Sequence, residues 1–434
     1  MKRTLFAALV SAAVALGAVS AHAATETQKQ TAIDDGLEWL AQTQQASGYW
    51  NAGDGYYDTS ATGAALLAFL EEGYSAGSDA IVNGTNYGDV VGDGLTYLFS
   101  QAQVYSISNE PAGNPDGDGN GVGLKFVLGG DNPRDTYVTG LVLPAIASTG
   151  TPNALVTTGP LAGRTDGTGP GGAWTHKDVV QNTVDYFAYG QADPGNSAQG
   201  GWRYYADYGQ ADNSTAQWPV IGMLFAQKMG VTAPSFVASE LENWIDYIQH
   251  YPGDGGSDYD TGHAWGSNMS RTGALLIEMA YAGYPTGDAT EQARYAAALG
   301  YINGQWNTGP SATWNGNFGH PYAMWSVYKG LDSTIGTDDT TTITPRLQGG
   351  AVIDAGDTWN WWEDYCEYLV STQNSSGYWG GYSNWNAYLA TPWNINILAA
   401  TQVPPPPPIP EPVTMAGLAL GIGGLVTYVR RRRR

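Results

Sequence analysis

The sequence has one cysteine and few basic side chains. Cys366 has no partner in the chain, so an intrachain disulfide cannot form and packing alone must hold the fold. The 434 residues contain 18 Lys and Arg against 40 Asp and Glu. Without Lys2, Arg3, Glu411 and the five terminal arginines, the chain keeps 11 basic and 39 acidic side chains, a net charge of −28. Because this charge repels phosphates and anionic lipid, it argues against nucleic-acid binding.

Aromatic residues and glycine are plentiful, with 16 Trp, 28 Tyr and 59 Gly. Aromatic rings supply the buried surface that packing requires, and glycine favours tightly turned loops. Residues 24–402 are long for one compact core. That length suits a repeat architecture, which adds core unit by unit.

The N-terminus has the pattern of a secretory signal peptide. Lys2 and Arg3 precede an apolar run from Leu5 to Val19, and Ala21-His22-Ala23 follows as a small-residue cleavage site. The apolar run is short for a membrane anchor, and no stop-transfer charges follow it. We therefore expect residues 1–23 to be a signal peptide and the body to be exported.

The C-terminus combines three features in a fixed order. Residues 403–412 are a proline-rich linker that includes Pro404 to Pro408 and ends in Pro410-Glu411-Pro412. An apolar stretch, Val413 to Val429, could just span a bilayer at about 25 Å, and Arg430 to Arg434 would stay on the cytoplasmic side. Residues 413–434 are therefore predicted to be a membrane helix with a basic tail.

This order resembles the PEP-CTERM sorting signal, whose Pro-Glu-Pro motif matches Pro410, Glu411 and Pro412. The resemblance implies processing by an exosortase-type membrane protease and transfer to the cell surface, usually in bacteria that make extracellular polysaccharide. A permanent C-terminal anchor is the alternative. Either way, the body is predicted to lie outside the inner membrane.

The body repeats one unit six times: an amphipathic helix, a loop with Gly and aromatic residues, and an apolar helix rich in small residues. The first and last copies share near-identical loops, Gln44 to Trp50 and Gln373 to Trp379. Six hairpins can bury their apolar second helices by closing into a ring. We predict an all-α fold, an α/α toroid over residues 24–402 with the second helices inside. An open solenoid is the alternative.

The Gln-x-x-x-Gly-x-Trp-like loops resemble those of the terpenoid cyclase and protein prenyltransferase toroids, and the resemblance spans the body. It implies the fold and says little about chemistry. The Asp-x-Asp-Asp acid of class II cyclases is absent. Asp364-Tyr365-Cys366 mimics half of a prenyltransferase zinc site, but no histidine follows His320, so Cys366 is predicted to be a small buried hydrophobe.

In a closed toroid all inner helices begin at one end, so their first residues should share one opening. His320, Tyr322, Arg271 and Asp212 are weak catalytic candidates there, with helix capping and loop structure as the simpler interpretation. Aromatic side chains in the preceding loops could stack on sugar faces, although many could simply fill gaps between hairpins. The candidate ligand-binding residues are Trp50, Tyr57, Trp202, Trp265, Trp314, Trp379 and Trp385.

One segment resembles a calcium loop. Asp116, Asp118 and Asn120 followed by Gly121 match its first, third, fifth and sixth positions. The twelfth position is Val127 in place of the bidentate Glu, so a solvated glycine-rich turn is favoured over a calcium site. No other metal or cofactor is expected.

Two functional hypotheses follow. The first is a non-enzymatic surface protein that binds or organises extracellular polysaccharide or another envelope partner. The second is an enzyme, a polysaccharide lyase or hydrolase or an isoprenoid-active enzyme, that uses the toroid cavity.

Overall fold

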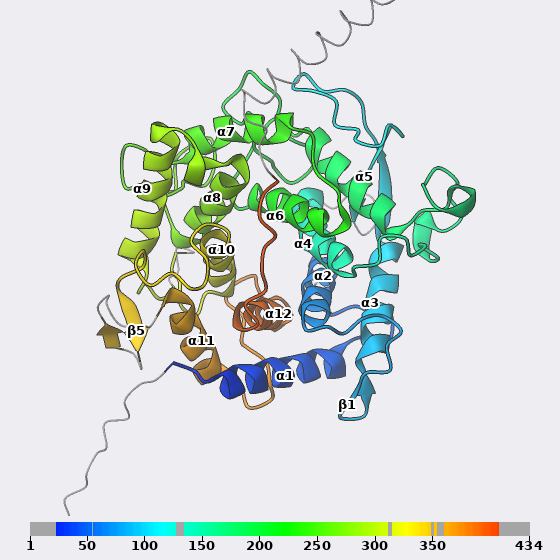
Figure 1. The fold of residues 1–434 in the computed structure, drawn as a ribbon, viewed down its shortest axis with the longest axis horizontal. Coiled ribbons are helices and arrows are strands. Elements are labelled where there is room, and N and C mark those ends of the chain that lie inside the picture. Colours follow the sequence, from blue (N-terminus) through cyan, green and yellow to red (C-terminus); the bar gives the residue numbers. More distant parts are fainter. Residues whose placement is uncertain are drawn as a thin grey trace, which may run out of the picture.

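The computed structural model describes residues 23–53, 55–126, 134–310, 315–348, 351–353 and 360–407. The described part is mostly helical. Six helices form an inner ring: α2 (Gly55–Glu71), α4 (Asp135–Ser148), α6 (Gln217–Ala226), α8 (Met269–Ala282), α10 (Pro321–Asp332) and α12 (Ala387–Leu398). Six others surround them: α1 (Glu26–Thr43), α3 (Tyr87–Ser100), α5 (His176–Tyr189), α7 (Phe236–Ile248), α9 (Ala289–Gln305) and α11 (Trp361–Thr372) (Figure 1).

Shorter elements lie in the connections. Three antiparallel hairpins pair β1 (Ile81–Val82) with β2 (Thr85–Asn86), β3 (Ala102–Ser106) with β4 (Val122–Phe126), and β5 (Arg346–Gln348) with β6 (Ala351–Ile353). In the longest hairpin Ala102 pairs with Phe126 and Ser106 with Val122. Single 3₁₀ turns are η1 (Gly159–Leu161), η2 (Pro170–Gly172), η3 (Gln227–Met229) and η4 (Tyr284–Thr286).

The ring is closed. Each inner helix contacts the next one along the chain, and α12 contacts α2, while α1 contacts both α11 and α12. The Lys29 ammonium lies 2.9 Å from the Glu363 carboxylate, which joins the first outer helix to the last. The predicted toroid is thus confirmed for the described helices, and the open solenoid is not.

Local sequence signals set the helix starts. Thr25, Thr175 and Asp288 each form a capping box with the side chain three residues on, before α1, α5 and α9 respectively. Asn268 and His320 cap the inner helices α8 and α10 with their side chains. All these caps satisfy backbone amides that would otherwise lack partners, and those of α8 and α10 lie where the inner helices begin.

A glutamine in the repeated loop fastens neighbouring hairpins together. The Gln373 side-chain amide donates to Gly377 O (2.8 Å) in its own loop and to Ala32 O (2.7 Å) in α1. Gln44, Gln191 and Gln249 make the same pair of bonds, to their own loops and to α3, α7 and α9 respectively. The Gln373 pair therefore bridges the last and first repeats of the ring.

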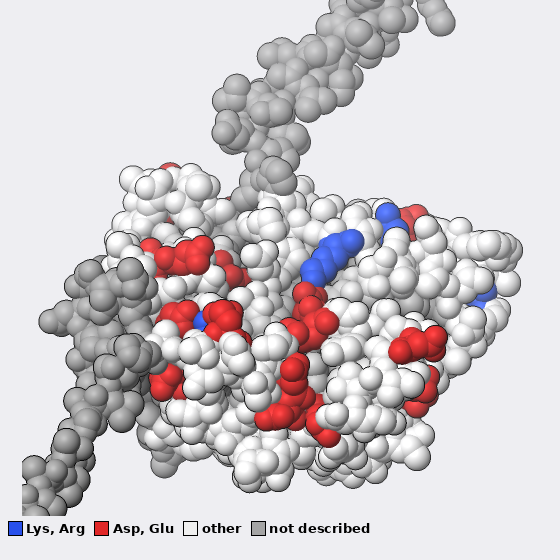
Figure 2. All heavy atoms as spheres, turned by 60° about the horizontal axis from the view of Figure 1, so that its bottom comes forward, with Lys and Arg blue, Asp and Glu red and all other residues white. Residues whose placement is uncertain are grey.

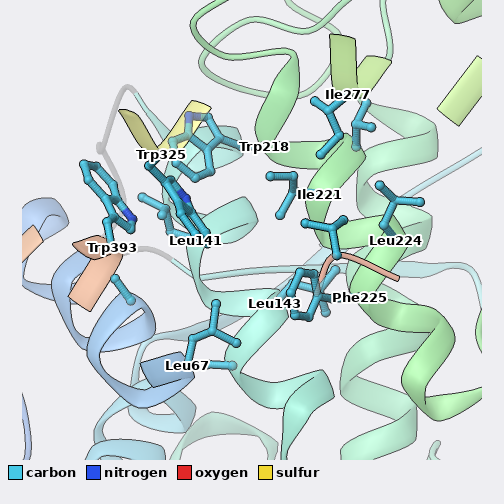
Figure 3. Close-up of a cluster of buried hydrophobic side chains, with 14 of the residues drawn as sticks. Leu67, Leu141, Leu143, Trp218, Ile221, Leu224, Phe225, Ile277, Trp325 and Trp393 are labelled. Atoms are coloured by element: carbon cyan, nitrogen blue, oxygen red, sulfur yellow. The ribbon is translucent and has the colours of Figure 1, made fainter. Parts of the chain in front are cut away.

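The centre of the ring is filled with apolar side chains. Trp218, Trp325 and Trp393 lie beside leucine and isoleucine side chains of the inner helices (Figure 3). Two charged residues interrupt this core, since Glu278 and Lys329 are fully buried. The Lys329 ammonium lies 4.1 Å from the centre of a Trp218 ring and 3.2 Å from Gln217 Oε1.

The segment after α12 crosses the end of the ring where the inner helices terminate (Figure 1). Tyr328 donates to Thr401 O (2.9 Å), the amide of Val403 donates to Asp332 (3.0 Å), and Gln227 donates to Pro405 O (3.0 Å). These bonds close that end of the toroid, so the opposite end is the open one.

Three sequence predictions concern residues outside the described part of the chain: most of the signal peptide at 1–23, the motif Pro410–Pro412 and the membrane helix at 413–429. Within the described part, no helix combines the length and the apolar character that a bilayer crossing requires. The described surface carries many acidic and few basic side chains on the face drawn in Figure 2.

Candidate ligand cavity

A cavity of about 680 Å³ occupies the open end, where the six inner helices begin. Its size falls within the range of about 300–1000 Å³ that is typical of small-molecule sites. Aromatic and polar side chains from all six repeats form its wall: Tyr57, Arg134, Tyr137, Tyr204, Ser214, Tyr259, Ala264, Trp265, Asn268, Ser270, Arg271, Tyr322, Asn384 and Trp385. Residues remote in sequence therefore meet at this opening.

The predicted site residues divide into three groups. Tyr57, Trp265, Trp385, Arg271 and Tyr322 line the cavity. Trp314 lies outside the described residues. The remaining candidates lie elsewhere: Trp50, Trp202, Trp379, His320 and Asp212.

Trp50, Trp202 and Trp379 are buried inside the hairpins instead of at the opening. Each indole N–H donates to a carbonyl near the end of the preceding outer helix, at 2.8 Å in every case. These bonds add a side-chain donor to carbonyls near the C-terminal ends of the outer helices. The three rings are therefore packing elements, and we leave them out of the proposed site.

Asp212 is fully buried and already engaged. Its carboxylate lies 2.7 Å from the Arg203 guanidinium and accepts from the backbone amides of Ser214 and Thr215, both at 2.9 Å. Burial raises the pKa of Asp212, and Arg203 and these hydrogen bonds only partly offset it. The residue caps the turn that leads into α6, which is the simpler interpretation of its sequence context.

His320 lies behind the cavity wall. Its Nδ1 accepts from the amide of Ala323 at 3.3 Å, and its ring contacts Tyr382 and Trp385 at centroid distances of 4.8 and 5.0 Å. Burial lowers the pKa of His320 to about 4, so the imidazole is neutral near pH 7. Its Nε2 has no hydrogen-bond partner among the described residues.

Tyr322 reaches the cavity, but its hydroxyl group has two partners. It donates to Ser214 O (2.8 Å) and accepts from the Gln217 side chain (2.7 Å). Burial raises the pKa of Tyr322 well above its usual value. The phenol is therefore unsuited to take a proton as a base, whereas its ring stacks on Trp385 with centroids 4.6 Å apart and forms a flat aromatic wall.

Two guanidinium groups also line the cavity. Arg134 donates to the Tyr57 hydroxyl (2.9 Å) and lies 5.6 Å from the centre of the Tyr204 ring. Arg271 donates to Gly266 O (2.6 Å) and lies 5.2 Å from the centre of the Tyr259 ring. The described wall contains no Asp or Glu. The cavity is thus basic although the whole body is acidic.

The two arginines nearest the Tyr259 ring differ in electrostatic balance. Burial lowers the pKa of Arg271, and Asp258 and nearby tyrosines only partly offset that effect. For Arg203, burial acts in the same direction, but Asp212 together with Tyr259, Tyr204 and Asp260 outweighs it, and the pKa rises. Of these two, Arg271 is therefore the guanidinium that would gain more from an added anion.

Sequence reasoning missed Arg134, Tyr137 and Tyr259 as residues of the cavity wall. Arg134 and Tyr137 could have been found, because they stand at the start of an inner helix as Tyr322 does. Tyr204 and Tyr259 lie in long loops, and their hydroxyl groups approach each other to 3.4 Å. A pairing of two loops that far apart in sequence has no local signature.

Neither a protein-family model nor a curated protein sequence matches this chain. Among solved structures, the chain is similar to the apo form of the type II terpene cyclase MstE from Scytonema, at 12% identity and a TM-score of 0.49, over 87% of this chain and 98% of that one. It is also similar to a D-mannose isomerase, at 11% identity and a TM-score of 0.44, again over 87% and 98%. At this distance the likenesses carry no argument about function.

Proposed function

We propose that this chain is an exported surface protein whose toroid binds an acidic saccharide in the open cavity without turning it over. The observation that carries the proposal is the composition of the cavity wall. Flat rings such as Tyr322 and Trp385 line the same cavity as two arginines, Arg134 and Arg271, and no carboxylate lies among the described lining residues.

Each part of this wall fits one part of an acidic sugar. The faces of Tyr322 and Trp385 suit the C–H-rich face of a pyranose ring, and polar groups such as Asn268 and Ser270 suit its hydroxyl groups. A guanidinium binds a carboxylate or sulfate through paired, charge-assisted hydrogen bonds. Arg134 and Arg271 could supply such bonds at either side of one sugar unit.

The export and sorting segments support the same location. The signal peptide at 1–23 and the PEP-CTERM-like tail at 410–434 would deliver the toroid to the cell surface, where an exosortase-type protease would process the tail. An acidic polysaccharide of the cell envelope is the ligand that we propose for that location. Binding in the cavity would tether the protein to them.

The candidate catalytic groups are already paired or buried, which favours a non-catalytic role. Asp212 is held by Arg203, the Tyr322 hydroxyl is occupied on both sides, and His320 is buried behind the wall. A lyase or hydrolase needs a free base or a pair of carboxylates facing the substrate. The enzyme hypothesis predicts turnover of a saccharide, which can be measured as new reducing or unsaturated ends.

Calorimetric titration of residues 24–407 with size-matched oligogalacturonate and neutral galactan tests the proposal. We expect the acidic oligosaccharide to bind at least about tenfold more tightly, because one charge-assisted hydrogen-bond pair contributes about 1.5–3 kcal/mol. Arg271→Gln should remove most of that preference. Arg164→Gln, which alters an arginine paired with Asp166 outside the cavity wall, should keep it.

Three results would count against the proposal. Equal affinity for both saccharides would refute the role of the arginines, and absence of binding to either would refute saccharide recognition by the cavity. New reducing or unsaturated ends that disappear in a Tyr322→Phe, His320→Ala double variant would establish the enzyme in place of the binding protein.

A further inference from the structure

The loop that joins β3 to β4 packs against helix α5, and none of its residues lines the ligand cavity. The loop contains Asp116, Asp118 and Asn120, whose spacing resembles a calcium loop that lacks its last acidic ligand. Helix α5 presents Asn182 and Asp185 to this loop, and both side chains are fully buried. Asp185, which follows Asp116 by 69 positions, therefore lies beside a loop whose calcium motif lacks its last acidic ligand.

Three carboxylates meet at this contact. One oxygen each from Asp116, Asp118 and Asp185 lies within 4.8 Å of the other two. Ligands on opposite sides of a Ca²⁺ ion lie about 4.6–5.2 Å apart, because each Ca–O distance is about 2.3–2.6 Å. The spacing of the three oxygens is therefore compatible with binding to one ion.

Asp185 provides the observation that a solvated acidic turn does not explain. Its Oδ1 accepts from the amide of Gly117 at 3.0 Å, so the carboxyl group faces the loop. Its Oδ2 is buried and has no hydrogen-bond partner. An unsatisfied buried carboxylate oxygen costs stability, and a cation among the three carboxylates would supply the missing interaction.

The surroundings of Asp185 give it no compensating positive charge. Its pKa is raised to about 8, chiefly by burial and also by the nearby Asp118 and Asp116, while hydrogen bonds from Gly117 and Gln181 act against this. No Lys or Arg forms an ion pair with any of the three carboxylates within the described part of the chain.

The loop also has the backbone that close approach requires. A Cβ atom at Gly117 would come within 2.5 Å of Gln181 Nε2 and 3.1 Å of Asp185 Oδ1. Within the loop, Asp116 accepts from the amides of Gly119 and Gly121 at 2.7 and 2.8 Å. Gly119 and Gly121 both have positive φ, at 79° and 76°. The loop is thus shaped to bring Asp116 and Asp118 to α5.

We propose that Asp116, Asp118 and Asp185 bind one Ca²⁺ ion, which fastens the β3–β4 loop to helix α5. The site is separate from the ligand cavity, and its existence does not depend on the proposed function. Asp185 replaces the final acidic ligand of a continuous calcium loop with one from a distant helix.

Calcium titration of the full-length chain in detergent, after removal of divalent ions with EGTA, tests the site. Calorimetry should give one site per chain with a Kd of about 10⁻⁴–10⁻³ M, the range of extracellular calcium modules, and markedly weaker binding of Mg²⁺. Saturating Ca²⁺ should raise the Tm by about 1–3 °C, because it binds the folded chain.

Variants place the binding at this loop. Asp185→Asn should abolish the heat of binding and the Tm shift, and Asp118→Asn should weaken binding at least about tenfold. Asp118 is exposed, so its variant keeps the test valid if Asp185→Asn does not fold. Glu278→Gln is the matched control, because Glu278 is also fully buried with unpartnered oxygens but lies outside this cluster. It should respond to Ca²⁺ as the parent does.

Two outcomes would overturn the proposal. One is a parent protein with no heat of binding and no Tm shift at about ten times the upper expected Kd of ~10⁻³ M. The other is a folded Asp185→Asn or Asp118→Asn variant that binds Ca²⁺ with the affinity of the parent, which would place the ion elsewhere on the acidic surface.

Discussion

Gln373 joins the last repeat of the ring to the first through one side chain. Gln373 is half-buried and donates two hydrogen bonds, one within its loop and one to Ala32 in the first helix. Gln373→Ala removes both bonds and leaves the two carbonyl oxygens without this donor. At about 0.5–1.5 kcal/mol for each bond, the free energy of unfolding should fall by about 1–3 kcal/mol.

The assay has two parts. Thermal unfolding should show a Tm lower by about 1–4 °C in the Gln373→Ala variant. Hydrogen exchange should show faster opening of α1 and α11 in particular, since the lost bond joins those two helices' repeats. Gln191→Ala is the matched control, because it removes the same pair of bonds at an internal junction and should open α5 and α7 instead.

The reasoning would be refuted by either of two results. A Gln373→Ala variant with unchanged Tm would mean that the bridging bonds contribute nothing measurable. A variant with the same exchange pattern as Gln191→Ala would mean that the first and last repeats do not meet through this loop.

Two further predictions concern buried titratable groups. Burial lowers the pKa of His320 to about 4, so as pH falls below about 6.5 the unfolded chain binds a proton that the folded chain does not. Stability should therefore fall by up to about 1.4 kcal/mol per pH unit between pH 6.5 and 4, and urea unfolding of His320→Asn, which keeps a capping side chain, should show a smaller loss. Burial, and to a lesser extent Asp212, raises the pKa of Glu278 well above 4.5. As pH rises above about 4.5, the unfolded chain loses a proton that the folded chain keeps, so the free energy of unfolding should fall. Glu278→Gln should remove this fall, and parallel pH profiles of the variant and the parent would contradict the assignment.

The toroid could be predicted from the sequence because the same helix–loop–helix pattern recurs along the chain. Helical periodicity recurs six times, and the Gln44 and Gln373 loops mark equivalent positions in the first and last copies. The structure gives both glutamines the same pair of hydrogen bonds. The prediction that Cys366 is a small buried hydrophobe is also confirmed, since the residue is a free, fully buried thiol.

The cavity was only partly predictable, because a tryptophan in a loop can serve two purposes. Trp50 and Trp385 both stand in glycine-rich loops before an inner helix. Trp50 turns inward and donates to Leu40 O, whereas Trp385 reaches the cavity and stacks on Tyr322. The choice depends on the path of each loop in three dimensions, which composition does not specify.

The candidate calcium site shows the same limit for a local motif. From the sequence, a calcium site was disfavoured because Val127 occupies the position where a continuous calcium loop has its last acidic ligand. Asp185 reaches the loop only because α5 packs on β4. A contact made by packing between elements carries no signal in the spacing of the residues that form it.

A structure determined with an oligogalacturonate bound tests the central claim most directly. The account predicts a sugar ring stacked on the Tyr322 and Trp385 wall at the open end of a closed six-repeat ring, with its carboxylate bound by Arg134 or Arg271. A closed ring with the saccharide bound outside this cavity, or an experimental structure in which α12 does not contact α2, would contradict it.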